Sequence, residues 1–315
     1  MGFNGPPKAK VVEKENSPLA TEGGVETREK SGEAFRQTVE AGIREALDII
    51  RDRFEHAENP LDNLAFHNTR HTEGVIERMK MILVALQAEE RVALLGELVA
   101  AYHDIVQKYD VVDGMRKRNI GANEQESDAE LFAYMQARQQ VFSKEDVMIV
   151  NETIEEATTP DWNVTNKTVF QPNQSRYSGD IARALAFADL GTAGMEEPDA
   201  YIVDGNNLFR EENIDIADAL QNPDLLTDTQ RESFTKRMLA WTSSQPSFAE
   251  GRKNLLDVEL GSLPEEKAKA VKELFLHFDR NIRRAEQNVT HREKMSFEEL
   301  AQDFGYKVPS LVSVG

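Results

Sequence analysis

The chain has 315 residues, of which 40% are hydrophobic, so it can form one large domain or two with a substantial core. Its formal net charge of −19 opposes binding to a nucleic-acid duplex or to an anionic membrane. Cysteine is absent, which excludes disulfides, thiolate metal ligands and cysteine nucleophiles.

The first predicted helix follows an amino-terminal tail. Residues 1–32 are rich in Lys, Glu, Gly, Pro and Ser and offer few apolar side chains, so we expect a disordered segment. Ser31 is suited to cap the helix that follows. Apolar residues then recur at helical spacing, and we expect this helix to pack across the later ones. They are Phe35, Val39, Ile43, Leu47, Ile50 and Phe54.

The second predicted helix, residues 67–86, overlaps the six residues from Phe66 to His71 (FHNTRH). If His67 and His71 are both helical, they lie four residues apart on one face, where their imidazoles can address a single cavity. Taken alone, two such histidines are more often core or surface residues than metal ligands.

A third predicted helix carries the pair His103-Asp104 within an apolar stripe. The stripe consists of Val92, Leu95, Leu98, Val99, Tyr102 and Val106. An unpaired buried carboxylate is costly, so Asp104 needs a cation, hydrogen-bond donors or a metal, and the adjacent histidine favours a metal. Asp189 follows the apolar run 181–188 and has the same requirement. Either acid can instead cap a helix or pair with an arginine.

Two irregular segments interrupt the predicted helices. Residues 107–122, which contain Asp113-Gly114, indicate a long loop next to His103-Asp104, and loops of this length often have a function. Residues 158–174 include two prolines and a tryptophan, and we expect them to form another wall of a cleft.

The carboxy-terminal part also has helical patterns. Residues 201–212 continue the main domain, and a separate part starts near residue 222. Ser262 and Pro264 mark the start of a helix with one apolar stripe. The stripe consists of Ala268, Val271, Leu274, Phe275, Phe278, Ile282 and Ala285, and Phe297, Leu300 and Phe304 add a short final helix.

These patterns predict an all-α fold of three parts. The parts are a tail (1–32), a main helical domain (33–221) and a helical carboxy-terminal extension (222–315). We expect the extension to cover the helical bundle. A homodimer contact or a site for a regulatory partner are the alternatives for the same helices.

Taken in order, the motifs resemble the HD-domain superfamily of metal-dependent phosphohydrolases, whose signature is a His, a His-Asp pair and a distant Asp on an all-helical bundle. The resemblance covers about residues 60–215, and FHNTRH is similar to the Tyr-His-Asn-x-x-His segment of cyclic-nucleotide phosphodiesterases and small bacterial relatives. It implies that His71, His103, Asp104 and Asp189 bind the metal and that His67 protonates the leaving oxygen.

A further segment, NEQES at residues 123–127, resembles the Asn-Glu-x-x-Ser segment of small bacterial members, where the glutamate faces the metal-bound water. That position is Glu124. The same residue also suits the first turn of a helix, where acids are favourable.

Two features of the sequence depart from the family pattern. Phe66 stands where Tyr is usual, which removes a hydroxyl but keeps an aromatic wall. No histidine lies between Asp104 and Asp189, whereas the two-iron oxygenases and the cyclic-dinucleotide-cleaving branch add histidines there. A second ion would therefore need Asp104 as a bridge together with waters, an arrangement that suits Mg²⁺ or Mn²⁺.

The resemblance implies a divalent cofactor (Mn, Mg, Zn or Fe), with one or two ions per chain. The expected reaction is hydrolysis of a small phosphate ester, a nucleotide or cyclic nucleotide, by metal-activated water, with His67, Asp104 and Glu124 as catalytic residues. Basic side chains are expected to hold the phosphate oxygens. The candidates are Lys108, Arg116, Lys117, Arg118, Arg176 and Arg183.

Two alternatives remain at the sequence level: an iron-dependent oxygenase on the same fold, and a non-catalytic metal or nucleotide sensor. The missing histidines disfavour the first, and the complete set of four ligands disfavours the second. Among partners we expect a small phosphorylated substrate and neither a nucleic-acid duplex nor a membrane. No apolar run approaches the roughly 18 residues of a membrane span, and the start lacks a signal-peptide core, so we expect a cytoplasmic protein.

Overall fold

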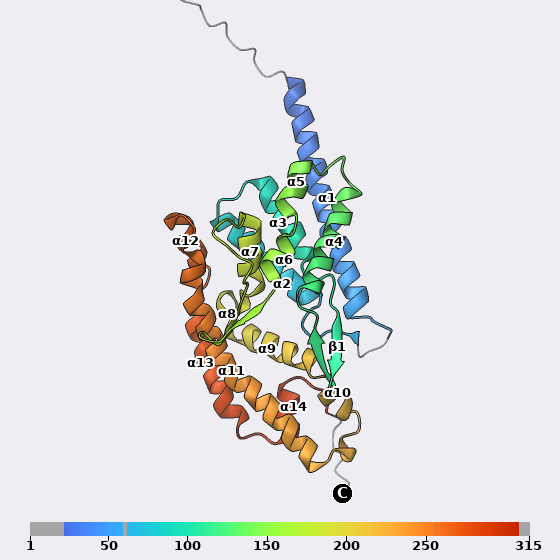
Figure 1. The fold of residues 1–315 in the computed structure, drawn as a ribbon, viewed down its shortest axis with the longest axis vertical. Helices are drawn as coiled ribbons and strands as arrows, with labels where there is room; N and C mark the ends of the chain where they lie inside the picture. The colour runs from blue at the N-terminus through green and yellow to red at the C-terminus, as the bar shows by residue number, and fades with distance from the viewer. Residues whose placement is uncertain (1–21, 59–61, 309–315) are drawn as a thin grey trace, which may run out of the picture.

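Helices dominate the fold, and the strands of the described residues form two antiparallel two-stranded hairpins (Figure 1). The computed structural model describes residues 22–58 and 62–308. This composition confirms the predicted all-α class. The elements are α1 (Glu22–Phe54), α2 (Thr69–Ala85), α3 (Glu90–Tyr102), β1 (Tyr109–Val112), β2 (Met115–Arg118), α4 (Ala122–Gln136), α5 (Lys144–Val150), α6 (Thr153–Thr158), β3 (Asp161–Asn163), β4 (Thr168–Phe170), α7 (Asp180–Asp189), α8 (Thr192–Met195), α9 (Pro198–Glu212), α10 (Ile214–Ala219), the 3₁₀ turn η2 (Pro223–Leu225), α11 (Asp228–Leu260), α12 (Glu265–Lys272), α13 (Phe278–Arg292) and α14 (Phe297–Asp303).

The first helix starts earlier than its sequence pattern indicated. Helix α1 begins at Glu22 rather than after Ser31, so the last part of the predicted tail is helical, and residues 1–21 lie outside the described residues. Phe35, Val39 and Ile50 of the predicted apolar stripe are buried. This confirms an amphipathic helix that packs on the later ones, principally along α3.

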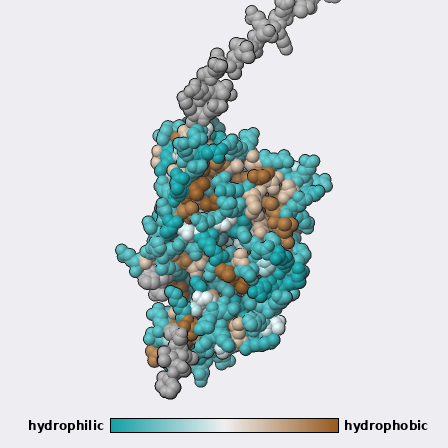
Figure 2. Space-filling model, turned by 180° about the vertical axis from the view of Figure 1, so that it is seen from behind, coloured by the Kyte–Doolittle hydropathy of each residue, from teal (hydrophilic) through white to brown (hydrophobic). Residues whose placement is uncertain are grey.

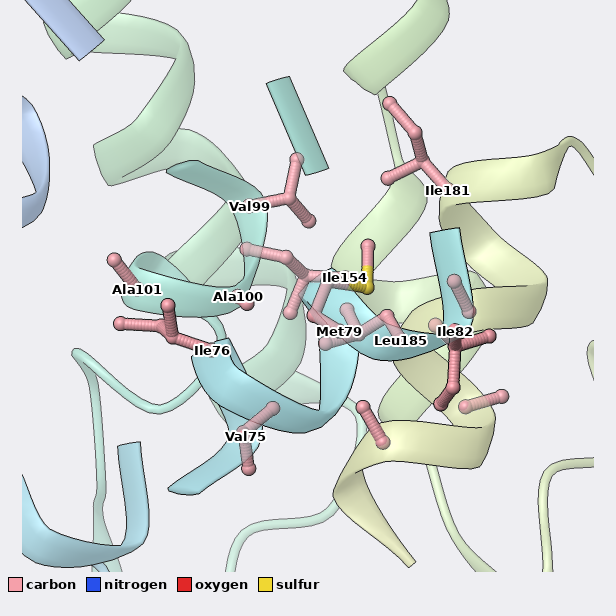
Figure 3. Packing of buried hydrophobic residues seen from close by; sticks show 14 of the residues in the cluster. Val75, Ile76, Met79, Ile82, Val99, Ala100, Ala101, Ile154, Ile181 and Leu185 are labelled. Atoms are coloured by element: carbon pink, nitrogen blue, oxygen red, sulfur yellow. The ribbon is translucent and has the colours of Figure 1, made fainter. Parts of the chain in front are cut away.

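The main core lies where α2, α3 and α7 pack against one another (Figure 3). Met79 and Ile82 of α2, Val99 of α3 and Leu185 of α7 are all fully buried at 0% exposure. Each such side chain contributes about 1.5–3 kcal/mol relative to an exposed one. The residues of the predicted metal site lie in these helices or directly after α3, so the core fixes their relative positions.

The two segments predicted as loops each contain a β-hairpin. In β1–β2 the turn is Asp113-Gly114, and both residues have positive φ, 53° and 79°. A two-residue turn with positive φ at both positions matches the right-handed twist of the strands, and Asp-Gly is among its preferred sequences. The interpretation of residues 107–122 as an irregular loop was therefore wrong, because the Asp113-Gly114 turn joins two paired strands.

The apolar stripe predicted as one helix near residues 264–285 is divided between α12 and α13. Between the two helices, His277 donates its backbone N–H to the carbonyl of Gly194 in α8, at 2.8 Å, which ties the start of α13 to α8. Phe275 and Phe278 stack at 5.7 Å over this point. A β-carbon at Gly194 would lie 2.6 Å from the Phe278 ring, so only glycine permits this approach.

The carboxy-terminal helices cover one end of the molecule. Helices α11 and α13 run side by side along its flank, and α14 lies beside α11 (Figure 1). A second, smaller core joins them to the end of α9, with Phe209, Met238 and Leu300 buried at its centre. The helices from α11 onward are therefore packed against the end of α9.

The surface agrees with the charge of the chain. The rear face is mostly hydrophilic, with a few separate hydrophobic areas (Figure 2). Among the helices of the described residues, none combines the length and apolar character that a membrane crossing requires.

Candidate metal centre

Helix α2 positions His71 in its first turn. The cap of this helix is Asn68, whose side-chain oxygen accepts the backbone N–H of His71 at 3.2 Å. A capping Asn satisfies a backbone donor that would otherwise have no partner and so fixes where the helix begins. The helix therefore starts at Thr69, and the prediction that His67 lies on the same helical face as His71 was wrong.

The other predicted ligands lie at the carboxy-terminal ends of two helices. Helix α3 ends at Tyr102, so His103 and Asp104 follow it rather than lying inside it, and Asp189 is the last residue of α7. The carbonyl end of a helix carries partial negative charge. Two such ends, together with two carboxylates, create a strong local preference for a cation.

The four side chains meet in one buried cluster. The Nε2 atoms of His71 and His103 lie 3.3 Å apart. Oδ2 of Asp104 lies 3.3 Å from the first and 2.9 Å from the second. Oδ1 of Asp189 lies 3.5 Å and 3.7 Å from the same two nitrogens. One ligand atom of each residue lies within 4.8 Å of all the others.

These separations fit a divalent metal ion. Metal–ligand bonds of about 2.1 Å place neighbouring ligand atoms about 3.0–3.4 Å apart in octahedral or tetrahedral coordination. In addition, Nδ1 of His103 donates to the carbonyl of Ala100 at 2.7 Å. This bond leaves the lone pair on Nε2, which faces the cluster, as is usual for a ligating histidine. The set of two imidazoles and two carboxylates can therefore hold a metal ion.

The electrostatics of the cluster also call for positive charge. Burial lowers the pKa of His71, but hydrogen bonds and charges from Asp104 and Asp189 outweigh it and raise the pKa to about 9. Burial raises the pKa of Asp104, yet the neighbouring histidines hold it well below its usual range, and the pKa of Asp189 is lowered in the same way. Without a metal, a proton on His71 supplies the cation that the two acids require.

His67 is held beside the cluster by Glu211 of α9. Nδ1 of His67 donates to Oε1 of Glu211, and Oε2 accepts the backbone N–H groups of Phe66 and His67 at 2.7 Å and 3.0 Å. The Tyr109 hydroxyl donates to Oε1 of Glu211 at 2.6 Å. Nε2 of His67 points to the cluster and lies 4.0 Å from Oδ2 of Asp104. The imidazole is thus oriented by a carboxylate on one side and faces the candidate metal position on the other.

Glu124 is separated from the cluster by Arg118. It is fully buried in the first turn of α4, where Oε2 accepts the backbone N–H of Gly121 at 2.6 Å. Nη2 of Arg118 lies 3.0 Å from Oε1 of Glu124 and 3.3 Å from Oδ1 of Asp104. Arg118 therefore bridges the two acids. This geometry favours the helix-start interpretation of Glu124, and its contact with a metal-bound water stays a prediction.

A cavity of about 280 Å³ opens beside the cluster. His67, Asp104 and Asp189 reach its wall. The segment 158–174 contributes to another side, as the sequence predicted, and α11 contributes a third. Residues from these two sides are Thr158, Pro160, Val169, Gln171, Trp241, Gln245 and Phe248. The carboxy-terminal extension is therefore part of the candidate site and not only a cover.

The predicted phosphate clamp is only partly assembled at this cavity. Of the six basic candidates, Arg118 lines the cavity. Arg116 and Lys117 line a separate surface groove that lies next to it.

The remaining basic candidates lie elsewhere. Lys108 pairs with Glu126 at 2.5 Å on the surface. Arg183 is buried and donates to the carbonyls of Ser178 and Arg176, both at 2.8 Å, which ties the preceding segment to α7. Arg176 itself is exposed. The structure gives these three residues surface or packing contacts, away from the residues that line the cavity.

Sequence patterns did not indicate Glu211, Tyr109 or the aromatic wall from α11. Glu211 lies 144 residues from its partner His67, and no local spacing connects them. The one available signal was the acid pair Glu211-Glu212 at the end of an amphipathic helix, because an acid at a helix carboxy terminus is locally unfavourable.

Comparison of the chain with protein-family models, with curated proteins and with solved structures gives no match. The chemistry of the protein is therefore inferred from the site itself.

Proposed function

We propose that the protein is a metal-dependent phosphohydrolase that cleaves a small phosphate ester, with the HD-domain pattern of ligands. The observation that carries the proposal is the juxtaposition of the four-residue cluster with the His67–Glu211 pair at one cavity. A metal site alone serves many functions. A histidine held by a carboxylate, with its second nitrogen facing that site, is the arrangement that general acid catalysis needs.

The residues divide the chemistry between them. A divalent ion held by His71, His103, Asp104 and Asp189 would supply a hydroxide from bound water and neutralise phosphoryl charge. His67 would donate the proton on Nε2 to the leaving oxygen, while the Glu211 carboxylate stabilises the imidazolium. This acid contribution is typically worth about 10²–10⁴ in rate.

The cavity favours a substrate with a single phosphoryl group. Arg118 is the one Lys or Arg side chain among its lining residues, whereas several acids line it: Asp104, Asp189, Asp204, Glu211 and Glu212. A polyphosphate chain would meet uncompensated negative charge. The apolar and aromatic wall suits the organic part of an ester, such as a nucleoside, and this supports a nucleotide or cyclic nucleotide as substrate.

The test measures phosphate or nucleotide release by the purified protein loaded in turn with Mn²⁺, Mg²⁺, Zn²⁺, Co²⁺ and Fe²⁺. The substrates are nucleoside monophosphates, cyclic nucleotides, guanosine polyphosphates and sugar phosphates. Asp104→Asn removes a ligand charge, and Asp224→Asn, an exposed acid of η2, is the matched control. We expect metal-dependent turnover that is retained in Asp224→Asn and lost in Asp104→Asn.

Turnover that persists in Asp104→Asn contradicts the mechanism. Absence of turnover with metal bound also contradicts the hydrolase, and oxygen consumption by the Fe²⁺-loaded protein would then identify an oxygenase. Absence of both activities with metal bound would indicate a sensor.

A further inference from the structure

A second concave site adjoins the cavity at the metal cluster. It is an open groove of about 560 Å³ between β2, the end of α9 and the middle of α11, and we call it the basic groove. Glu212 and Trp241 line both the groove and the cavity. These two residues therefore form the wall between the two sites.

The groove concentrates positive charge in an acidic protein. Arg116, Lys117 and Arg237 line it together with the acid Glu212, and Arg237 is also paired with Asp215 at 2.5 Å. Among the described residues, no carboxylate lies within salt-bridge distance of Lys117, which is exposed. Arg116 lies over the Tyr109 ring, 5.5 Å from its centroid, and its Nη1 donates to the carbonyls of Asn63 and Glu211 at 3.4 Å, while the acids of the described residues form no ion pair with it. In a chain of net charge −19, a group of basic side chains in one groove indicates a site for an anion.

Two residues that line the groove each have a buried donor without a hydrogen-bond partner in the structure. The donors are Nε of Arg237 and Nε1 of Trp241. The other guanidinium nitrogens of Arg237 are paired, with Asn213 at 3.0 Å and with Asp215 at 2.5 Å. An unpaired buried donor is unfavourable, so such groups in native proteins usually serve a ligand or an ordered water.

The rest of the groove is apolar. Met115, Phe209 and Ala240 contribute to its surface, and most of the lining is carbon. A ligand matched to this surface combines an apolar or aromatic body with an anionic group.

We propose that the basic groove is a second binding site, for a small aromatic or apolar anion, distinct from the site at the metal cluster. Lys117 and Arg116 hold the anionic group, Arg237 adds positive charge beside them, and Trp241 contacts the body of the ligand. This proposal goes beyond the hydrolase and does not depend on it, because binding in the groove requires no metal.

The test uses the full chain with Trp162→Phe, so that Trp241 is its remaining tryptophan and reports on binding by fluorescence. The protein is treated with a chelator and titrated with phenylphosphonate at pH 8 and low ionic strength. We expect a saturable change in Trp241 emission. Lys117→Gln should raise the Kd about fivefold, and Glu212→Gln, which removes the facing acid, should lower it about fivefold.

The matched control is Lys236→Gln, because Lys236 is exposed on α11 and lies outside the groove; its Kd should stay within about twofold. His71→Ala should also leave the Kd unchanged. Equal Kd values for Lys117→Gln and Lys236→Gln would overturn the proposal. So would equally tight binding of uncharged benzyl alcohol, no binding at all, or loss of binding in His71→Ala, which would place the ligand at the cluster.

Discussion

Glu211 accepts a hydrogen bond from Nδ1 of His67 and also accepts the backbone N–H of the same residue. One carboxylate thus fixes both the ring and the chain just before α2. Burial raises the pKa of Glu211, but the facing imidazole and the hydrogen bonds from His67, Tyr109 and Phe66 lower it to about 2. Glu211 is therefore ionised at neutral pH and is placed to stabilise a protonated His67.

Substitution Glu211→Gln tests this role. It keeps the shape but removes the charge, and we expect kcat to fall about tenfold to hundredfold with metal content unchanged. The loss should be smaller for a p-nitrophenyl ester, because a good leaving group needs little protonation. The measurement is kcat for the best alkyl substrate and for the aryl ester, with metal analysis of both proteins. An equal loss on both esters would indicate a purely structural role.

Removal of a cluster residue should abolish tight metal binding. His71→Ala takes away one imidazole and leaves two buried carboxylates that still need a cation, so we expect metal affinity to fall by more than about a hundredfold. His56→Ala is the control, since His56 is not part of the cluster. Metal per chain after dialysis against a weak chelator gives the readout. Equal metal content in the two variants would contradict the ligand assignment.

Local sequence patterns pointed to the four residues of the cluster because each belongs to a short motif or follows an apolar run. His103 and Asp104 are adjacent, and Asp189 closes a run of buried residues, so their burial was readable along the chain. The exact ends of the helices could not be read from the sequence. Periodicity alone extended α2 back to residue 67, whereas Asn68 caps its amino terminus, so that the helix begins at Thr69.

Tertiary contacts decided the rest of the site. Glu211 reaches His67 only because α9 packs beside the start of α2, and Trp241 reaches the cavity because α11 folds back over the main domain. No regular spacing of residues along the sequence predicts either contact. The predicted division into a main domain and an extension followed the helical patterns, whereas the cavity is lined by residues of both parts.

The cap of α2 can be tested by stability. Asn68→Ala removes the acceptor for the backbone N–H of His71, and the donor to the carbonyl of Ala65 at 3.0 Å. We expect a loss of about 1 kcal/mol in the free energy of unfolding. Asn68→Asp keeps an acceptor and should retain most of that stability. Urea unfolding followed by circular dichroism measures both. Equal destabilisation by Ala and Asp would show that the acceptor does not matter.

Glu212, in the wall between the cavity and the basic groove, should make the stability of the protein depend on pH. Burial and then the charge of Glu211 raise the pKa of Glu212 to about 7 from its ordinary value of 4.5. The folded protein therefore binds this proton more tightly than the unfolded chain does. Stability should fall as the pH rises from about 4.5 to 7, by up to about 3 kcal/mol for a shift of this size.

Glu212→Gln mimics the protonated form at every pH, so it should not share this loss. We expect the Tm of the variant to exceed that of the wild-type chain by several degrees more at pH 8 than at pH 5. About 1 kcal/mol shifts the Tm of a chain of this size by roughly 2–4 °C. The control is Glu250→Gln, an exposed position on α11, which should show no such difference. Thermal unfolding between pH 5 and 8 gives the comparison. A Tm difference for Glu212→Gln that does not change with pH would mean that the carboxyl is ionised throughout this range, and that burial in the wall does not hold its proton.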